Sequence, residues 1–382
     1  MGGASREIKR VMLVVGEASG DLHGANVARC LYQQSPGIEI FGVAGVALRR
    51  VGVEVLVDVA QLTGMGFAEL LGNLRTLWQS YRLLRRVLRE RRPHLLILID
   101  FPEFNLRLAR VAKKLEIPVL YYISPQVWAW RRRRIHKIAK RVDQMAVVFP
   151  FEVPLYEREG VPVSFVGHPL LDVVQPSQSR EITLKQYGLD PSRSTIALLP
   201  GSREREVGYL LPPMLQAAER LGQQMEVQFL IVRASTVNLW DLQEKVARAS
   251  ITIPIAEGNT YNSLGASDLV WTASGTATVE TALMLRPMVI VYRLAWLTYG
   301  IARLLVQVNH IGMVNIVAGE TVVPELIQTH VTAERIIKES RNILEDSAVR
   351  CEMVKKLAAV RGKLGSPGAA NRVADLARAM MV

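Results

Sequence analysis

Two stretches of the sequence have the pattern of phosphate-binding turns. ALLPGSREREV (197–207) and LVWTASGTATVE (269–280) each pass from an apolar run through small residues into helix-forming sequence. This order predicts a strand, a tight turn and a helix N-terminus, where free backbone N–H groups and the helix dipole favour an anion. Two such turns in one half of the chain indicate a diphosphate, whereas either turn alone is an ordinary feature of an α/β domain.

Carboxylates stand at the predicted exits of two other strands. Glu17 and Asp21 follow VMLVV together with Ser19, and Asp100 ends HLLILID. The first turn lacks the G-x-G-x-x-G spacing and places acids where a cofactor pyrophosphate would lie, so it does not predict NAD or FAD. An acid at the exit of a buried strand can have its pKa raised toward that of a general base. Helix capping or a loop hydrogen bond is the structural alternative for Ser19, Asp21 and Asp100.

Buried strands that alternate with helices are predicted to position these residues. The apolar runs lie at 11–15, 94–100, 119–124, 144–149, 195–200, 227–232, 268–274 and 288–293. Continuous rather than alternating hydrophobicity predicts strands covered on both faces, and hence parallel sheets in α/β layers. A polar, turn-rich segment (169–194) separates two Rossmann-like domains. We expect domains at 1–175 and 176–360, and a terminal helix within 361–382 that packs back on the first domain.

Two segments combine arginine with tryptophan. Between residues 69 and 92, helical spacing places a leucine stripe on one face, with several arginines and Trp78 along its flank. This pattern is typical of a helix at an anionic membrane surface, although packing on the sheet with a solvated basic face is the ordinary alternative. In SPQVWAWRRRR (124–134), Trp128 and Trp130 precede four arginines, which suits a phosphorylated lipid or nucleic acid. Because no recognisable nucleic-acid-binding motif accompanies them, we expect no nucleic-acid partner.

The composition is that of a globular protein that binds anions. Of 382 residues, 49% are hydrophobic and 21% charged, and the formal net charge is +12. This surplus favours partners such as anionic lipid or a phosphorylated substrate. Two cysteines and six scattered histidines form no ligand cluster, so we expect no metal, no cofactor and a reduced cytosolic setting. The apolar run 11–15 is too short for a signal peptide, and no run reaches the length of a membrane span.

Several longer blocks of sequence together point to one family. They are GEASGD (16–21), GMGFAELL (64–71), IDFPEFN (99–105), YYISPQVWAWR (121–131), FPFE (149–152), FVGHPLLD (165–172), LLPGSREREV (198–207) and ASGTATVE (273–280). In this order they resemble the lipid-A-disaccharide synthases. The likeness extends to PELIQ (324–328) and therefore covers most of the chain.

The resemblance implies an α/β protein of the GT-B fold, with two facing Rossmann-like domains, parallel sheets and a C-terminal helical segment. It implies an inverting glycosyltransferase that moves 2,3-diacylglucosamine from UDP to 2,3-diacylglucosamine 1-phosphate. The products are a β-1,6 disaccharide of lipid A biosynthesis and UDP, and this fold generally needs no metal. Acyl chains on both substrates explain an apolar and basic surface, and imply a peripheral place on the cytoplasmic membrane. A homodimer is one assembly that we consider.

The resemblance also implies roles for single residues. We expect Asp100 to be the general base that takes the proton of the acceptor 6-hydroxyl, with Glu17 and Asp21 as rivals. The residues expected to bind the acceptor are Ser19, Asn105 and Trp128. Backbone N–H groups and the Arg203 guanidinium are expected to stabilise the negative charge that develops on the departing diphosphate. The residues expected to bind the UDP-sugar are Gly201, Ser202, Arg203, Ser274, Gly275, Thr276, Glu280, Asn315 and Glu320, of which Glu280 resembles the acid that holds the ribose.

Two other functions remain open. Another GT-B enzyme, either a UDP-GlcNAc epimerase or an undecaprenyl-linked transferase, would turn over a non-acylated UDP-sugar. A non-catalytic basic module that binds membrane or RNA would keep the fold without turnover. Such a module would be indifferent to the substitution Asp100→Asn, which separates it from the enzymes.

Overall fold

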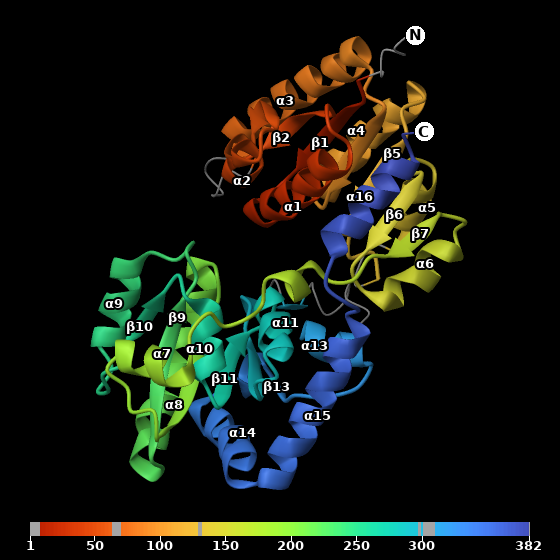
Figure 1. Cartoon of the computed structure of the whole chain (residues 1–382). Helices are drawn as coiled ribbons and strands as arrows, with labels where there is room; N and C mark the ends of the chain where they lie inside the picture. Colours follow the sequence, from red (N-terminus) through yellow and green to blue (C-terminus); the bar gives the residue numbers. More distant parts are fainter. Residues whose placement is uncertain (1–7, 63–69, 129–131, 297–298, 301–309, 382) are drawn as a thin grey trace. The chain divides into compact units, whose positions relative to one another are not determined.

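The computed structural model describes residues 8–62, 70–128, 132–296, 299–300 and 310–381. Trp130 and most of the GMGFAELL block lie outside these residues. The chain divides into two compact units. Unit 1 consists of Met1–Asp172 and Gly365–Val382, and unit 2 of Val173–Leu364. Each unit is one parallel sheet with helices on its faces (Figure 1).

Unit 1 is built on a seven-stranded sheet in the order β3-β2-β1-β4-β5-β6-β7. The strands are β1 (Arg10–Val15), β2 (Glu39–Ala44), β3 (Glu54–Asp58), β4 (Leu95–Ile99), β5 (Val119–Tyr122), β6 (Gln144–Val147) and β7 (Val163–Phe165). The helices are α1 (Ala18–Gln34), α2 (Val46–Arg50), α3 (Leu70–Arg91), α4 (Pro102–Lys114), α5 (Ile135–Ala139), α6 (Val153–Glu157) and α16 (Ala369–Ala379). Short 3-10 turns lie at Val59–Gln61, Arg132–Arg134, Pro150–Glu152 and Pro169–Asp172.

Unit 2 is built on a six-stranded parallel sheet in the order β10-β9-β8-β11-β12-β13. The strands are β8 (Ser194–Leu199), β9 (Val227–Arg233), β10 (Ile255–Glu257), β11 (Leu269–Ala273), β12 (Met288–Tyr292) and β13 (Glu325–Ile327). The helices are α7 (Arg180–Gln186), α8 (Glu204–Gln224), α9 (Leu239–Ala247), α10 (Thr260–Ala266), α11 (Thr276–Leu283), α13 (Met313–Ala318), α14 (Ala333–Glu345) and α15 (Ser347–Lys363). A 3-10 turn lies at Gln328–His330.

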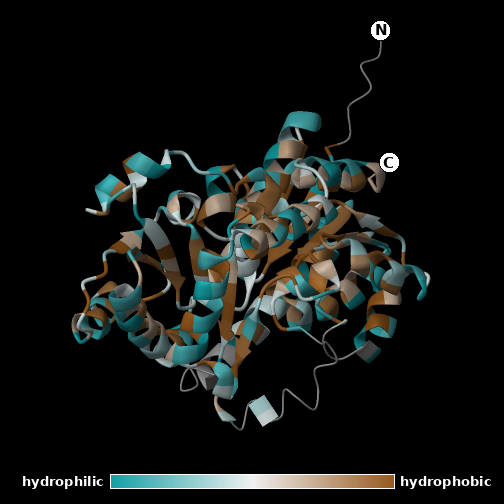
Figure 2. Ribbon diagram, turned by 90° about the horizontal axis from the view of Figure 1, so that it is seen from below, coloured by the Kyte–Doolittle hydropathy of each residue, from teal (hydrophilic) through white to brown (hydrophobic). Residues whose placement is uncertain are grey.

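The central strands are apolar because helices cover both faces of each sheet. Every residue of β4 and of β11 is buried, and Figure 2 shows the strands as hydrophobic and the helices as banded with hydrophilic residues. All eight strands predicted from the sequence are present, as β1, β4, β5, β6, β8, β9, β11 and β12. The sequence did not predict β2, β3, β7, β10 and β13, and four of these are edge strands.

The last helix belongs to the first unit. Helix α16 contacts α1, and its Val373, Ala374 and Ala377 are fully buried in the core of unit 1. The Gly368 N–H donates to Asp172 Oδ1 at 2.6 Å, and Arg372 Nε donates to the Val166 carbonyl at 2.7 Å. Apolar packing and these hydrogen bonds therefore hold the chain terminus on the unit that contains its beginning.

Helix α3 has the amphipathic form that its sequence predicts. Leu84 and Leu88 are fully buried, whereas the Trp78 side chain is 57% exposed. The Arg82 guanidinium lies 4.5 Å from the centre of the Trp78 ring, a cation–π contact. Among the residues described, no helix combines the length and apolar character needed to cross a bilayer.

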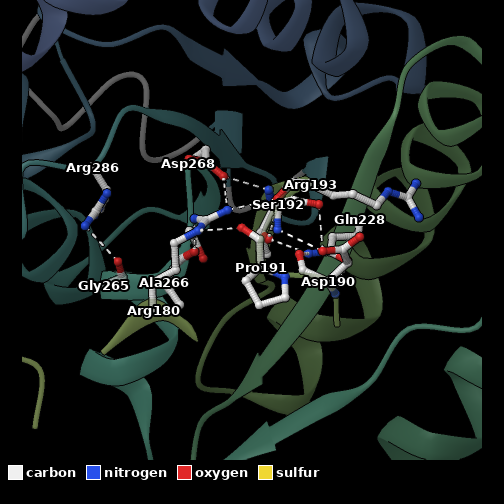
Figure 3. Close-up of polar contacts among 12 residues, drawn as sticks. Arg180, Asp190, Pro191, Ser192, Arg193, Gln228, Gly265, Ala266, Asp268 and Arg286 are labelled. Carbon is white, nitrogen blue, oxygen red and sulfur yellow. Dashed lines mark hydrogen bonds and ion pairs between the residues drawn. The ribbon is translucent and has the colours of Figure 1, made fainter. Parts of the chain in front are cut away.

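A polar cluster fixes the amino ends of β8 and β11 in unit 2 (Figure 3). Arg180 pairs with Asp268 at 2.9 Å and also donates to the Ala266 and Arg193 carbonyls. Asp268 in turn accepts the Thr195 N–H at 2.8 Å. These bonds hold the entry to β11 beside the entry to β8, so the two strands also end side by side.

Candidate functional site

In both sheets the strand order reverses between two central strands. Strands β1 and β4 are neighbours, with Val15 opposite Ile99, and β8 and β11 are neighbours, with Leu199 opposite Thr272. Connections leave these strands in opposite directions, so a crevice opens at their carboxyl ends, which is where open α/β sheets bind ligands. The four turns singled out from the sequence follow these four strands. Each unit therefore presents one pair of turns.

The pair in unit 1 brings Glu17 and Asp100 together. Burial raises the pKa of the Asp100 carboxyl, and the negative charge of Glu17 raises it further, while the Phe101 N–H opposes the shift. Glu17 and Ser19 are exposed in the neighbouring turn. A Cβ added to Gly16 would lie only 2.2 Å from Phe101 Cβ. The two turns are thus in direct contact, and only glycine allows this approach.

The Asp100–Phe101 turn has a strained backbone. Asp100 has φ +47° and Phe101 has φ +48°, a left-handed conformation that costs a non-glycine residue about 1–3 kcal/mol. Asn105 Nδ2 donates to the Asp100 carbonyl at 2.7 Å and to the Ile99 carbonyl at 3.2 Å. The Tyr121 hydroxyl donates to the same Asp100 carbonyl at 2.5 Å. These bonds hold the carboxylate at the crevice, in a conformation that the backbone alone would not favour.

The first turn in unit 2 joins β8 to α8. Gly201 has φ +125°, and the Arg203 side chain is 81% exposed. The Ser202 N–H donates to Glu206 Oε2 at 3.1 Å, and Glu206 lies 3.4 Å from the Arg203 guanidinium. In the structure a carboxylate therefore occupies the N–H group that was expected to bind phosphate. The signal for this contact is a Glu at the third residue of a helix, a frequent N-terminal capping position.

The second turn in unit 2 joins β11 to α11 and is open. Gly275 has φ +141°, and no atom of the described part of the chain lies within 4 Å of a Cβ added there. Gly275 and Thr276 are exposed at the start of the helix. Ser274 Oγ donates to the Ile311 carbonyl at 3.0 Å, which fixes the turn and leaves its backbone accessible. Backbone N–H groups at such a helix start are suited to an anion.

Glu280 lies one turn further along α11. Its carboxylate accepts the Tyr261 hydroxyl at 3.1 Å. Burial raises the pKa of Glu280, and this hydrogen bond opposes the shift. A half-buried carboxylate of this kind can accept hydrogen bonds from a diol. Tyr261 was not expected from the sequence, because nothing in its own segment marks it.

Sequence comparison assigns the family. Residues 11–372 match the profile of the lipid-A-disaccharide synthetases. The chain belongs to the lipid-A-disaccharide synthetase family. A relative from Geobacter metallireducens, a lipid-A-disaccharide synthase, is 47% identical over 98% of this chain and 97% of its own length.

Solved structures show that this family member has the GT-B fold. A glycosyltransferase of kitacinnamycin superposes with a TM-score of 0.66, at 15% identity, over 98% of this chain and 99% of its own. The UDP-GlcNAc 2-epimerase from Neisseria meningitidis, bound to UDP-GlcNAc, gives a TM-score of 0.65 at 14% identity, over 97% and 100% of the two chains. At these identities the likeness concerns the fold alone.

Three residues of unit 1 have structural roles that differ from those expected. Asp21 is buried, and its carboxylate accepts the N–H groups of Gly45, Ala47 and Leu48 at 2.6, 2.7 and 3.2 Å. Its two oxygens thus hold the start of α2, which is a structural role. Asn105 is fully buried beneath the Asp100 turn. Trp128 is 8% exposed and packs edge-to-face on Phe151, with ring centres 5.2 Å apart, so neither residue is placed to bind an acceptor.

Two residues of unit 2 also differ from expectation. Asn315 is fully buried; its Oδ1 accepts the Val322 and Val323 N–H groups, and its Nδ2 donates to Glu325 at 2.8 Å. It therefore holds the chain around α13 and has no group left for a nucleotide. Glu320 is 59% exposed and pairs with Lys356 at 2.9 Å. It follows the end of α13 that is remote from the Ser274 turn, since Ser274 contacts Ile311 at the other end.

Two histidines of unit 1, the half-buried His23 and the buried His168, are uncharged at neutral pH because their pKa values are lowered. Burial lowers the pKa of His23 to about 4. Burial, and then the charge of His23, lower the pKa of His168 to about 3. His168 Nδ1 accepts the Leu170 N–H at 3.2 Å, so the proton of the neutral ring is on Nε2. Within the part of the chain that the structure describes, no three acidic, His or Cys side chains are grouped to hold a metal ion.

Proposed function

We propose that this chain condenses UDP-2,3-diacylglucosamine with 2,3-diacylglucosamine 1-phosphate to give the β-1,6-linked lipid A disaccharide and UDP. It is a glycosyltransferase of lipid A biosynthesis. The observation that supports this chemistry best is the Asp100–Glu17 pair, in which a carboxylate of raised pKa stands at the strand reversal of unit 1. A base is what an attacking hydroxyl needs.

In the proposed reaction the acceptor O6 attacks the donor C1 from the face opposite the diphosphate. Asp100 takes the O6 proton, and the bond from C1 to the diphosphate oxygen breaks with both electrons going to UDP. The configuration at C1 is therefore inverted. Glu17 assists by its negative charge, which makes the neighbouring carboxylate a stronger base.

The leaving UDP is proposed to bind at the turns of unit 2. Negative charge grows on the diphosphate as the bond breaks, and preorganised N–H groups stabilise that charge. Ser274, Gly275 and Thr276 supply exposed backbone at the start of α11, and Glu280 is placed one turn on to accept the ribose hydroxyls. The exposed Arg203 side chain adds a positive charge. Use of the Ser202 N–H requires Glu206 to withdraw from it.

The working site of this enzyme is proposed to be the cytoplasmic face of the membrane, with peripheral attachment. Acyl chains keep both substrates in a bilayer. The exposed Trp78 and the arginines on α3 form a surface suited to anionic lipid, where aromatic rings and guanidinium groups favour the headgroup level.

Release of UDP tests the proposal. Purified protein in detergent micelles should release UDP only when both acylated substrates are present. No UDP with both substrates, or equal release from non-acylated UDP-GlcNAc, would refute the assignment. The proposed reaction uses no metal ion. Activity should therefore persist after dialysis against EDTA and should not rise on adding Mg²⁺.

A further inference from the structure

A large cavity lies on unit 1 beside the Asp100–Phe101 turn. Its volume is about 940 Å³, and it is formed between α3 and α4. Leu77, Trp78 and Tyr81 line one wall, and Phe101 and Phe104 line the other. The rings are packed together, since Phe104 stacks on Phe101 at 5.5 Å and meets the edge of Tyr81 at 6.2 Å. Together these side chains form a continuous apolar surface, which begins at Phe101, one residue after the proposed base Asp100.

Of the described residues that line the same cavity, four are arginines, namely Arg75, Arg107, Arg110 and Arg141, and one is acidic, Glu103. Glu103 is paired with Arg134. Among the residues described, Arg107 and Arg110 have no carboxylate partner. Arg141 donates to the Leu106 carbonyl at 3.0 Å, and its pKa is lowered by burial and by the neighbouring charge of Arg110. Like charges held together without a counter-ion are suited to a multiply charged anion such as phosphate.

We propose that this cavity binds the acceptor, with an acyl chain on the aromatic wall and the sugar phosphate on Arg107, Arg110 and Arg141. This inference rests on the proposed function, and it assigns a place to the substrate that the nucleotide turns do not hold. The acceptor is a phosphorylated acyl lipid, and membrane phospholipids such as phosphatidic acid have the same chemistry.

The register of α4 supports this arrangement. Glu103, Arg107 and Arg110 are spaced at helical intervals of four and three residues, so they share one face. Arg107 is six residues beyond Phe101, or about 9 Å along the axis. The Cα–Cβ bonds of a helix lean toward its N-terminus, which in α4 is the end next to Phe101 and Asp100, and Arg107 and Arg110 both line the cavity. A sugar whose hydroxyl meets Asp100 can then direct its phosphate to these arginines.

Acceptor specificity tests the proposal. The probes are 2,3-diacylglucosamine with and without its 1-phosphate, at saturating donor in detergent micelles, with UDP release as the readout. The natural chain should prefer the phosphorylated acceptor in kcat/KM. The double variant Arg107→Gln/Arg110→Gln should lose roughly 10- to 100-fold in kcat/KM for the phosphorylated acceptor, the range of one or two charged hydrogen bonds. Its kcat/KM for the acceptor without phosphate should be nearly unchanged.

The control variant is Arg50→Gln, which removes an exposed arginine at the end of α2. It should leave both acceptors unaffected. Equal kcat/KM for the two acceptors in the natural chain, or an equal loss for both in the double variant, would overturn the proposal. So would competition by phosphatidic acid as strong as that by the phosphorylated acceptor, since the cavity would then hold a bilayer lipid.

Binding without turnover separates this inference from the proposed function. Micelles that contain the phosphorylated acceptor should be retained by the immobilised natural chain in the absence of donor, and much less by the double variant. If the chain retains these micelles but releases no UDP, the proposed function fails and the cavity assignment stands. If it releases UDP but retention ignores the phosphate, the cavity assignment fails alone.

Discussion

Substitution of Gly16 by Ala tests whether contact between the two turns of unit 1 positions the base. The added Cβ would lie 2.2 Å from both Cβ and Cγ of Phe101, whereas ordinary contact begins at 3.4 Å. The Asp100–Phe101 turn must therefore move by about 1.2 Å. Forcing extra volume into a packed site costs about 1–3 kcal/mol, and a misplacement of about 1 Å can lower a rate roughly 10²-fold.

We expect Gly16→Ala to lower kcat about 100-fold and the free energy of unfolding by about 1–3 kcal/mol, with UDP affinity unchanged. Turnover is measured by UDP release, stability by urea unfolding, and UDP affinity by calorimetry. Gly20→Ala is the matched control, because its Cβ would lie 3.5 Å from the nearest atom, Val15 Cβ. Gly20 is within α1, where alanine stabilises a helix by about 0.5–1 kcal/mol.

A second variant tests the cause of the loss. Phe101→Gly removes the clashing atoms and also suits the left-handed φ of +48°. In a double-mutant cycle, Gly16→Ala should therefore destabilise the Phe101→Gly background less than the natural chain. Normal kcat and stability in Gly16→Ala would refute the contact, and additive effects in the cycle would show that the strain arises elsewhere.

Three further predictions concern charge. Asp100→Asn should lower kcat by about 10²–10⁴-fold and leave the free energy of unfolding unchanged or increased. Because the pKa of Asp100 is raised in the folded state, the folded state loses stability as pH rises through that pKa, and Asn removes this loss. Lower stability at pH 7 together with normal turnover would contradict this prediction. Glu206→Gln should tighten UDP binding roughly threefold, because one like charge near the protein surface is worth up to ~1 kcal/mol. Unchanged affinity by calorimetry would mean that Glu206 does not compete with the diphosphate at Ser202. The free energy of unfolding should fall as pH drops below 6.5. In the unfolded chain both histidines become protonated near that pH, whereas in the folded chain His23 is protonated only near pH 4 and His168 only near pH 3. By pH 5 this loss is about 2 kcal/mol per histidine, and His23→Phe should abolish part of it in urea titrations at pH 5 and pH 7.

Local sequence patterns predict much of the fold and of the crevice. Strands buried on both faces are continuous apolar runs, so β1, β4, β8 and β11 were predictable, and with them the turns that follow. Four of the strands that escaped prediction lie at sheet edges, where side chains are partly exposed. The fifth, β2, is buried along most of its six residues and was also not predicted. Asp100, Glu17 and Gly275 could be identified for the same reason. They follow buried parallel strands, and residues at that position lie at the carboxyl edge of the sheet.

Tertiary contacts decided what each of these residues can do. Asp21, Asn105 and Asn315 have the right type for a site, but each is bound to backbone groups. The partners of Asp21 come from a distant segment, and those of Asn105 and Asn315 from neighbouring turns. Trp128 was expected to bind the acceptor, but it is buried and packs against Phe151. The arginine-lined cavity joins two helices, so neither helix predicts it alone. Sequence thus determined which groups reach the crevice, because strand ends are fixed by local hydrophobicity. Only the folded chain decided which of them remain free, because a hydrogen bond to a distant segment leaves no mark on local sequence.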